Sequence, residues 1–558
     1  MAADGIHYEI FVKRHRKAGW SLAEAREDRE DAIALAEKLL TTLPTGSVRV
    51  SKERYDDASR TFKSSTVFEK GAEKFEQEKD KDGDASLPCL TPDDLSNPAA
   101  RDTIHRTLSQ WLERQQASPM ELLHRPDLVE MLETGGTELQ HAIQKVAVAS
   151  AREGDANVHA YTRQLQDLIG RALTRIYQDG RNKKLPNFPA GRSFARTVEE
   201  ICAKPNVYRL RAAIADRLSE ERSYRDKLKC LIGFTDDLPS DPELRDIALT
   251  ETDTFLSEIL GFDSGISGLV GEVADLGGEV QRLADIYCGK PDSEALADAP
   301  PASRQLAGMI ESLSATRTAV AQRLLAQLRK PRRMKPDCVA SEVKLARALA
   351  QQLVLAQGPE LPVDSLQDAF SQRSARLLTP ETIADYLEDA EDANEDITRL
   401  LALEENIVGE QNKKKLAGYV RAALGAHKTE SWYTRGPGNA LDRLARLARH
   451  QARANKGHYP EEDLNDLSRA FDKLGKKVLE TTGLIDQVAN SDRPALDRVT
   501  SLLKLATTGV LPAGECVAAA QVKAMKLLRS EAGLEEARAD GERVKLAEIE
   551  TLMKLLAA

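Results

Sequence analysis

The chain has 558 residues, more than the about 250–300 that one hydrophobic core can organise, so we expect several domains or one extended helical array. Hydrophobic residues make up 41% and charged residues 30%, which excludes a chain that is disordered throughout. Aromatic residues make up only 4%, which favours helical cores of Leu, Ala, Val and Ile over a β-rich fold.

The net charge of −10 argues against a protein that binds nucleic acid over its whole surface. No two of the six cysteines have the spacing of a zinc ribbon or a redox dithiol. Scattered cysteines are typical of a reducing cytosol, where they serve as small buried hydrophobes. Signal-peptide and membrane-span patterns are also missing, so we expect a cytoplasmic protein without a spanning segment.

The first 71 residues predict a small α+β domain. Ile6, Tyr8, Ile10 and Val12 alternate with polar residues, which is typical of a strand over residues 6–13. The pattern then predicts one helix and two strands, over residues 24–43, 47–53 and 60–69. The expected order is therefore β-α-β-β. The polar run that follows, residues 72–97, is typical of a charged linker.

The remainder predicts a mainly α fold, either a multi-helical bundle or an irregular helical array. Thr91, Asp241 and Thr379 each precede a proline, as N-cap residues do at a helix start. Continuous apolar periodicity predicts long single helices over residues 205–235, 264–288 and 380–404. Breaks rich in Pro and Gly divide the region into helical units at 98–180, 190–290, 300–425 and 438–558. No repeat signature is shared between these units, although the sequence leaves a degenerate helical solenoid as an alternative architecture.

Two clusters have weak resemblance to ligand sites. The acidic run from Glu388 to Asp396 lacks the turn glycine and terminal glutamate of a calcium loop, so we interpret it as a solvated helix face. The glycines between Gly261 and Gly278 are not followed by the lysine of a phosphate-binding loop. They are interpreted as a close helix contact or a hinge. We therefore predict no catalytic residue, no cofactor site and no metal site.

The best functional candidate is a basic helix at 438–453. Arg443, Arg446, Arg449 and Arg453 recur at helical spacing, and Leu441, Leu444 and Leu447 form an apolar stripe opposite. Such arginines either pair with acids of the same chain or form one docking face. Trp432, Tyr433 and Arg435 stand just before the helix, and aromatic residues with arginine are enriched in binding hot spots. We predict these seven residues as partner-binding.

The expected function is that of a cytoplasmic interaction or regulatory protein, a scaffold or adaptor that binds other proteins. One alternative is an enzyme whose active site is assembled from distant residues in a helical cleft. The other is a protein that binds nucleic acid or an anionic surface through residues 435–456. The sequence leaves the partner's identity open, and also whether the chain forms a homo-oligomer.

Overall fold

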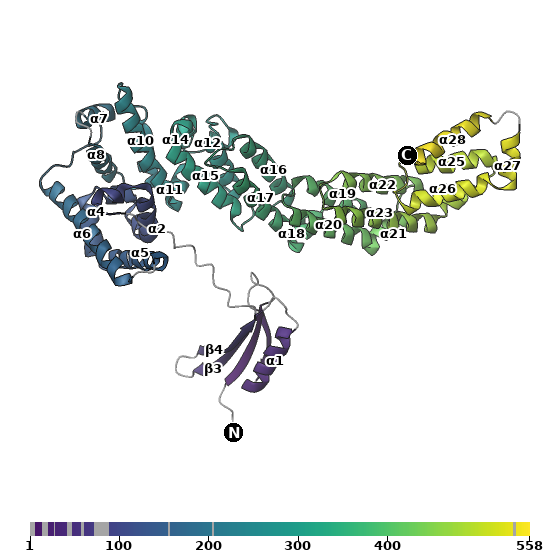
Figure 1. Ribbon diagram of the computed structural model, residues 1–558, viewed down its shortest axis with the longest axis horizontal. Coiled ribbons are helices and arrows are strands. Elements are labelled where there is room, and N and C mark those ends of the chain that lie inside the picture. The colour runs from purple at the N-terminus through teal and green to yellow at the C-terminus, as the bar shows by residue number, and fades with distance from the viewer. Residues whose placement is uncertain are drawn as a thin grey trace. The chain divides into compact units, whose positions relative to one another are not determined.

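The computed structural model describes residues 6–13, 21–26, 28–41, 47–56, 61–71, 89–154, 157–202, 206–539 and 543–557. They divide into two compact units, one of the described residues within 1–88 and 143–165 and the other of those within 89–142 and 166–558. The predicted fold class is confirmed: the chain is mainly α, with one small antiparallel sheet near its N-terminus (Figure 1).

The first unit contains a four-stranded antiparallel sheet in the order β2-β1-β3-β4. Its elements are β1 Ile6–Lys13, β2 Ser21–Arg26, α1 Arg29–Thr41, β3 Ser47–Asp56 and β4 Thr61–Gly71. The predicted order β-α-β-β was incomplete, because the start of the expected helix is instead β2. Its residues, SLAEAR, suit a helix, but pairing with β1 outweighs that local preference. The helix begins after Asp28, whose carboxylate accepts from the backbone N–H groups of Glu30 and Asp31 at 2.7 and 3.0 Å.

One face of this sheet is covered by α1. The predicted alternation is confirmed, since Ile10, Val48 and Val50 are buried together with Ala32 and Ala36 of the helix. Among the residues whose side chains the structure describes, these five are the fully buried hydrophobic residues of the cluster, and seven others are partly buried around them. The sheet therefore rests on a small core, as expected for a domain of this size.

The second unit is built from helices. Helices α2 to α15 are Pro98–Gln115, Pro119–Leu122, Pro126–Thr134, Glu138–Gly154, Val158–Arg181, Phe194–Cys202, Val207–Ser219, Tyr224–Phe234, Pro242–Ile259, Asp263–Val270, Leu276–Tyr287, Glu294–Ala297, Pro301–Met309 and Ser314–Arg329. Helices α16 to α28 are Val339–Leu355, Val363–Leu377, Pro380–Glu388, Ala393–Leu403, Glu410–Gly425, His427–Arg435, Ala440–Lys456, Glu461–Thr482, Leu484–Ala489, Ala495–Thr507, Glu515–Leu528, Glu531–Arg538 and Arg543–Ala557. Three short 3₁₀ segments are Pro92–Ser96, Ile310–Ser312 and Glu404–Asn406. Segment 143–165 of α5 and α6 is grouped with the first unit.

The three long helices predicted from periodicity are each broken in two. Ser223 lies in the turn between α8 and α9 and is the N-cap of α9. Its hydroxyl accepts a hydrogen bond from the backbone N–H of Asp226 at 3.2 Å. Asp275 caps α12 and Asp392 caps α19 in the same way, each at 2.8 Å. These short polar side chains lie inside an otherwise helical pattern, so they act as N-caps rather than as helix surface.

The end of the predicted linker belongs to the helical unit. Leu95 is buried against Leu168 and Ala172 of α6, and Arg171 donates to the carbonyl of Leu90 at 3.1 Å. Residues 89–97 therefore have enough apolar and polar contact to be ordered, contrary to the expectation for 72–97. Residues 72–88 lie outside the described part of the chain.

Three hydrophobic clusters follow one another along this unit. The first extends from Leu108 to Phe370, the second from Val339 to Ala520 and the third from Ala489 to Ile549. Helix α16 contributes to the first two clusters. Its N-terminal turns face the second cluster, and its later turns face the first. Packing is thus continuous across the predicted breaks at 180–190 and 290–300, which is the arrangement of an irregular helical array.

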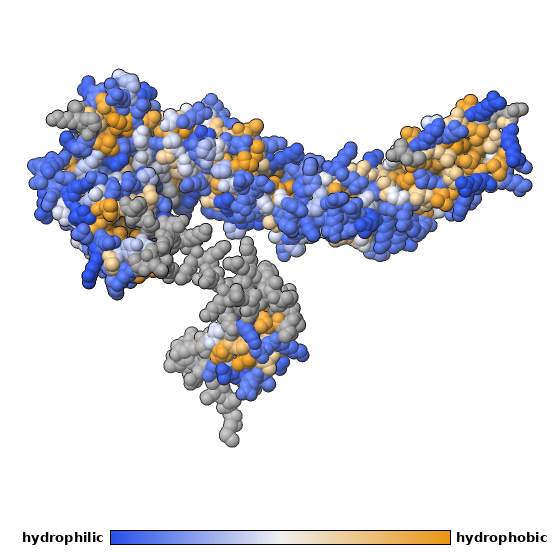
Figure 2. All heavy atoms as spheres, in the orientation of Figure 1, coloured by the Kyte–Doolittle hydropathy of each residue, from blue (hydrophilic) through white to orange (hydrophobic). Residues whose placement is uncertain are grey.

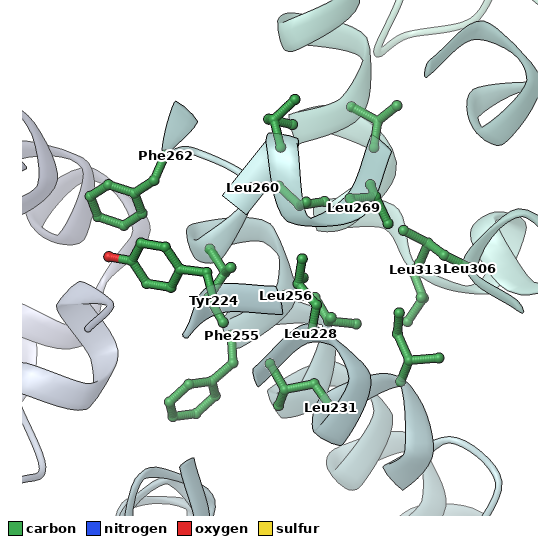
Figure 3. Packing of buried hydrophobic residues seen from close by; sticks show 14 of the residues in the cluster. Tyr224, Leu228, Leu231, Phe255, Leu256, Leu260, Phe262, Leu269, Leu306 and Leu313 are labelled. Carbon is green, nitrogen blue, oxygen red and sulfur yellow. The ribbon is translucent and has the colours of Figure 1, made fainter. Parts of the chain in front are cut away.

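The first cluster contains closely packed aromatic and leucine side chains (Figure 3). Tyr224 of α9 stacks on Phe262, with ring centroids 4.9 Å apart, and its hydroxyl donates to the carbonyl of Ala117 at 3.0 Å. Gly268 of α11 lies so close to α9 that a Cβ atom would be 3.1 Å from the Cα of Arg225. The interpretation of this glycine as a close helix contact is confirmed.

A buried ion pair joins α3 to α9. The ammonium group of Lys227 donates to the Glu121 carboxylate at 2.6 Å and to the carbonyl of Gln116 at 2.5 Å. Arg125 donates to the same carboxylate at 3.0 Å, while Lys227 and Glu121 are almost fully buried. Burial lowers the pKa of Lys227, and the neighbouring carboxylate opposes that effect.

Replacing Lys227 by Met should destabilise the unit by about 3 kcal/mol, because Glu121 would keep a buried charge with only Arg125 to compensate it. Urea unfolding followed by far-UV circular dichroism would measure the loss. The matched control is Lys523→Met, which removes the more exposed pair with Asp486 and should leave the unfolding midpoint near that of the wild type. Equal effects of the two changes would contradict the importance of the buried pair.

Candidate protein-interaction surfaces

The predicted basic helix is α22, which follows α21 after a Gly436-Pro437-Gly438 turn. Gly438 has a φ of 83°, a conformation that favours glycine, and Asn439 caps α22 by accepting from the backbone N–H of Asp442 at 2.7 Å. Leu444 and Leu447 are buried as predicted, whereas Leu441 is 37% exposed. The apolar stripe that fixes the rotation of α22 is therefore one residue shorter than expected.

Arg443 lies inside the protein rather than on the predicted outer face. Its guanidinium donates to four carbonyls, those of Tyr433, Thr434, Gly436 and Gly438, at 2.7–3.1 Å. These carbonyls stand at the C-terminal end of α21, where a helix leaves acceptors without intrahelical donors. The arginine satisfies them and adds a positive charge at the negative end of the helix.

Tyr433 is also buried, and its hydroxyl donates to the side-chain oxygen of Asn394 at 2.9 Å. The Nε2 atom of His450 lies 2.9 Å from the same oxygen. Burial, and to a smaller extent the nearby arginines, lower the pKa of His450 to about 4, so the ring is neutral at pH 7. A neutral ring donates through Nε2 here, because the amide oxygen is only an acceptor. These residues hold α19, α21 and α22 together.

The predicted surface is thus reduced to part of its residues. Arg435, Arg446 and Arg449 are exposed, and the guanidinium of Arg446 lies 6.0 Å from the ring centre of the half-buried Trp432. Arg453 is exposed but pairs with Glu405 at 3.3 Å. Arg446, Arg449 and Arg453 share one face of α22, whereas Arg435 ends α21, and partner binding by these residues stays a prediction.

Replacing Arg443 by Met should cost about 3 kcal/mol of stability, because four carbonyls, those of Tyr433 and Thr434 in buried hydrogen bonds, would lose a charged donor. The matched change Arg446→Met on the outer face of the same helix should change stability by less than about 0.5 kcal/mol. Thermal unfolding of both variants measures the difference. A melting temperature for Arg443→Met as high as that of Arg446→Met would be inconsistent with the capping role.

A pocket of about 590 Å³ lies between the start of α16 and helices α18 and α19. Both of its lining arginines already have partners in the chain: Arg333 pairs with Glu342 at 3.1 Å, and Arg399 pairs with Glu395 at 2.6 Å. Cys338 at the mouth is exposed, although the sequence predicted buried cysteines. Hydrogen bonds from Ser341 lower the pKa of this thiol.

Cys338 should therefore react with iodoacetamide before the other cysteines at pH 7.5, since the thiolate is the reactive form. Burial raises the pKa of Cys230 to about 11 and also raises that of Cys516, so both should react slowly. Timed alkylation followed by peptide mass spectrometry would give the order. Faster labelling of Cys516 than of Cys338 would contradict this assignment.

An apolar groove of about 570 Å³ lies on the C-terminal helices α25, α26 and α28. Helix α25 packs against both α26 and α28, and its Leu503 lines the groove between them. The α26 wall carries Gln521, Val522, Met525, Lys526 and Arg529, and the α28 wall carries Met553 and Leu556. No sequence motif marked this site, because its residues come from three helices that are separated in the chain.

Hydrophobic residues gather over these C-terminal helices (Figure 2). Val522 is 54% exposed, and Leu534, Val544 and Leu555 are exposed on the neighbouring surfaces. The cluster beneath has only seven fully buried residues against ten that are partly buried. An exposed apolar surface of this kind, above a cluster whose residues are mostly only partly buried, is typical of an interaction site.

Within the described ranges, no three His, Cys, Asp or Glu side chains are grouped so that they could hold a metal ion. None of the helices described has the length and apolar content needed to cross a bilayer. The chain matches no protein-family model, no curated protein and no solved structure.

Proposed function

We propose that the chain is a cytoplasmic scaffold or adaptor that binds another protein through the groove on α25, α26 and α28. The observation that carries this proposal is the apolar lining, in which Val522 is exposed and Met525 and Met553 are only partly buried. Methionine side chains adapt to differently shaped partners and are frequent in such surfaces.

The size and composition of the groove support a protein segment as its occupant. Its volume of about 570 Å³ falls within the range of ligand sites, but its polar lining groups are few and do not converge on one point. An enzyme would need several positioned polar groups of perturbed pKa around a reacting centre. The lining offers instead a wide apolar contact with two cations at its edge.

The basic face of α22 supports the alternative proposal, binding to an anionic surface, less well. Arg443 is used inside the protein and Arg453 is paired with Glu405, which leaves fewer free cations than the sequence suggested. Binding to nucleic acid usually requires many phosphate contacts and depends steeply on salt.

The proposal is tested by comparing two double variants with matched chemistry. Val522→Gln/Met525→Gln makes the groove polar without adding charge, and Val354→Gln/Leu355→Gln does the same to exposed residues of α16. We expect affinity purification with quantitative mass spectrometry to recover the partner with the wild type and the α16 variant. The groove variant should lose at least 90% of it, roughly a tenfold loss of affinity or more.

Val522, Val354 and Leu355 are exposed and Met525 is only partly buried, so the melting temperatures of both variants should stay close to that of the wild type. A groove variant that retains its full set of partners would contradict the proposed function. Loss of partners from the α16 variant alone would place the interaction elsewhere and would also contradict it.

A further inference from the structure

We infer that the occupant of the groove is an acidic amphipathic helix of a partner protein. This inference rests on the proposed function and adds the chemistry of the partner. It depends on two features of the C-terminal helices, the spacing of the groove residues and the charges that remain unpaired at its edge.

The spacing of the lining residues fits a helix. On α26 and at its C-cap they are Gln521, Val522, Met525, Lys526 and Arg529, and the last four are spaced i, i+3, i+4 and i+7, so the set forms one continuous face with Gln521 at its side. On α28 they are Met553 and Leu556, at i and i+3. Two helical ridges on either side of α25 leave a groove into which the ridge of another helix can pack, at the usual interaxial distance of about 8–10 Å. An incoming helix would present its own i, i+3, i+4 and i+7 side chains.

The charges at the groove predict acidic residues on that helix. Lys504, Lys523 and Lys545 of these helices pair with Glu548, Asp486 and Asp497 at 2.7–2.9 Å. Lys526 and Arg529 are exposed, and among the described residues no carboxylate lies within salt-bridge distance of either. The lining itself contains no carboxylate.

Covering the groove would move these two cations toward a low-dielectric contact, which costs free energy unless the occupant brings opposite charge. Carboxylates on the occupant would remove that cost and select the partner against neutral or basic helices. The unpaired cations therefore favour an acidic segment over a purely apolar one.

A second copy of this chain fits the groove less well. The neighbouring α27, Glu531–Arg538, is acidic and exposed, but Leu534 is its one large exposed hydrophobic residue. A helix that fills the groove needs apolar residues over two turns, and α27 has only eight residues. The structure therefore favours a longer helix from another protein.

The test uses the full chain and two labelled probe peptides of about 18 residues, long enough for appreciable helicity. Both carry Leu at i, i+3, i+4 and i+7, and one has Glu and the other Lys at every flanking position. Fluorescence anisotropy at physiological salt should show that the Glu peptide binds at least about tenfold more tightly, a difference of about 1.4 kcal/mol. The variant Lys526→Glu/Arg529→Glu should reverse this preference, and Val522→Gln/Met525→Gln should weaken binding of the Glu peptide.

The matched charge control is Lys504→Glu/Lys523→Glu, which reverses two cations outside the groove lining and should preserve the preference for the Glu peptide. Equal binding of both peptides, weakened alike by Val522→Gln/Met525→Gln, would overturn the acidic partner while leaving the proposed function intact. Failure of both peptides to bind, with the partner still lost from that variant in cells, would overturn the helical occupant alone. A dimer in sedimentation that the groove variant abolishes would identify a second copy instead and overturn the inference.

Discussion

The helical unit depends on arginine side chains that reach the C-terminal carbonyls of neighbouring helices. Arg282 donates to the carbonyls of Val270 and Glu272 after α11, at 2.7 and 2.9 Å. Arg373, almost fully buried, does the same for Gln327 and Leu328 at the end of α15, at 3.2 and 2.7 Å. Arg443 repeats the arrangement at α21, and Arg399 and Arg498 do so at α18 and α24. Each contact supplies donors to acceptors that a helix end leaves unsatisfied, and each fixes where a later helix lies.

This arrangement explains how a chain with 30% charged residues can form a continuous core. A guanidinium has five donors in a planar fork, so it can bond several carbonyls at once while its aliphatic stem packs among apolar side chains. The same arrangement shows why a row of arginines at helical spacing is weak evidence for a docking face. Arg443 and Arg446 are three residues apart, yet one is used by the backbone and the other is exposed.

Fold class was predictable from the sequence because composition and apolar periodicity are distributed over many residues. Helix boundaries were less predictable, because serine and aspartate also occur on helix surfaces. Ser223, Asp275 and Asp392 act as N-caps only because the chain turns at those positions. Strand β2 escaped prediction because its stability comes from pairing with β1, a contact that local propensity does not record. The groove escaped for a similar reason: Leu503, Val522 and Met553 are unremarkable leucine, valine and methionine residues until three helices bring them together.

The three hydrophobic clusters differ in how many buried side chains they contain and in how closely these pack. The first contains dozens of tightly packed side chains with stacked rings, and such interiors resist deformation. The third is small, and it shares the partly buried Ile485, Leu505 and Leu556 with the cluster before it. Fewer fully buried side chains therefore hold the last helices than hold the first cluster, and most residues of the third cluster are leucines. The proposed recognition surface, over a cluster with so few fully buried side chains, would tolerate variation in the sequence it contacts, with selectivity coming from charge and helical spacing rather than from one exact shape.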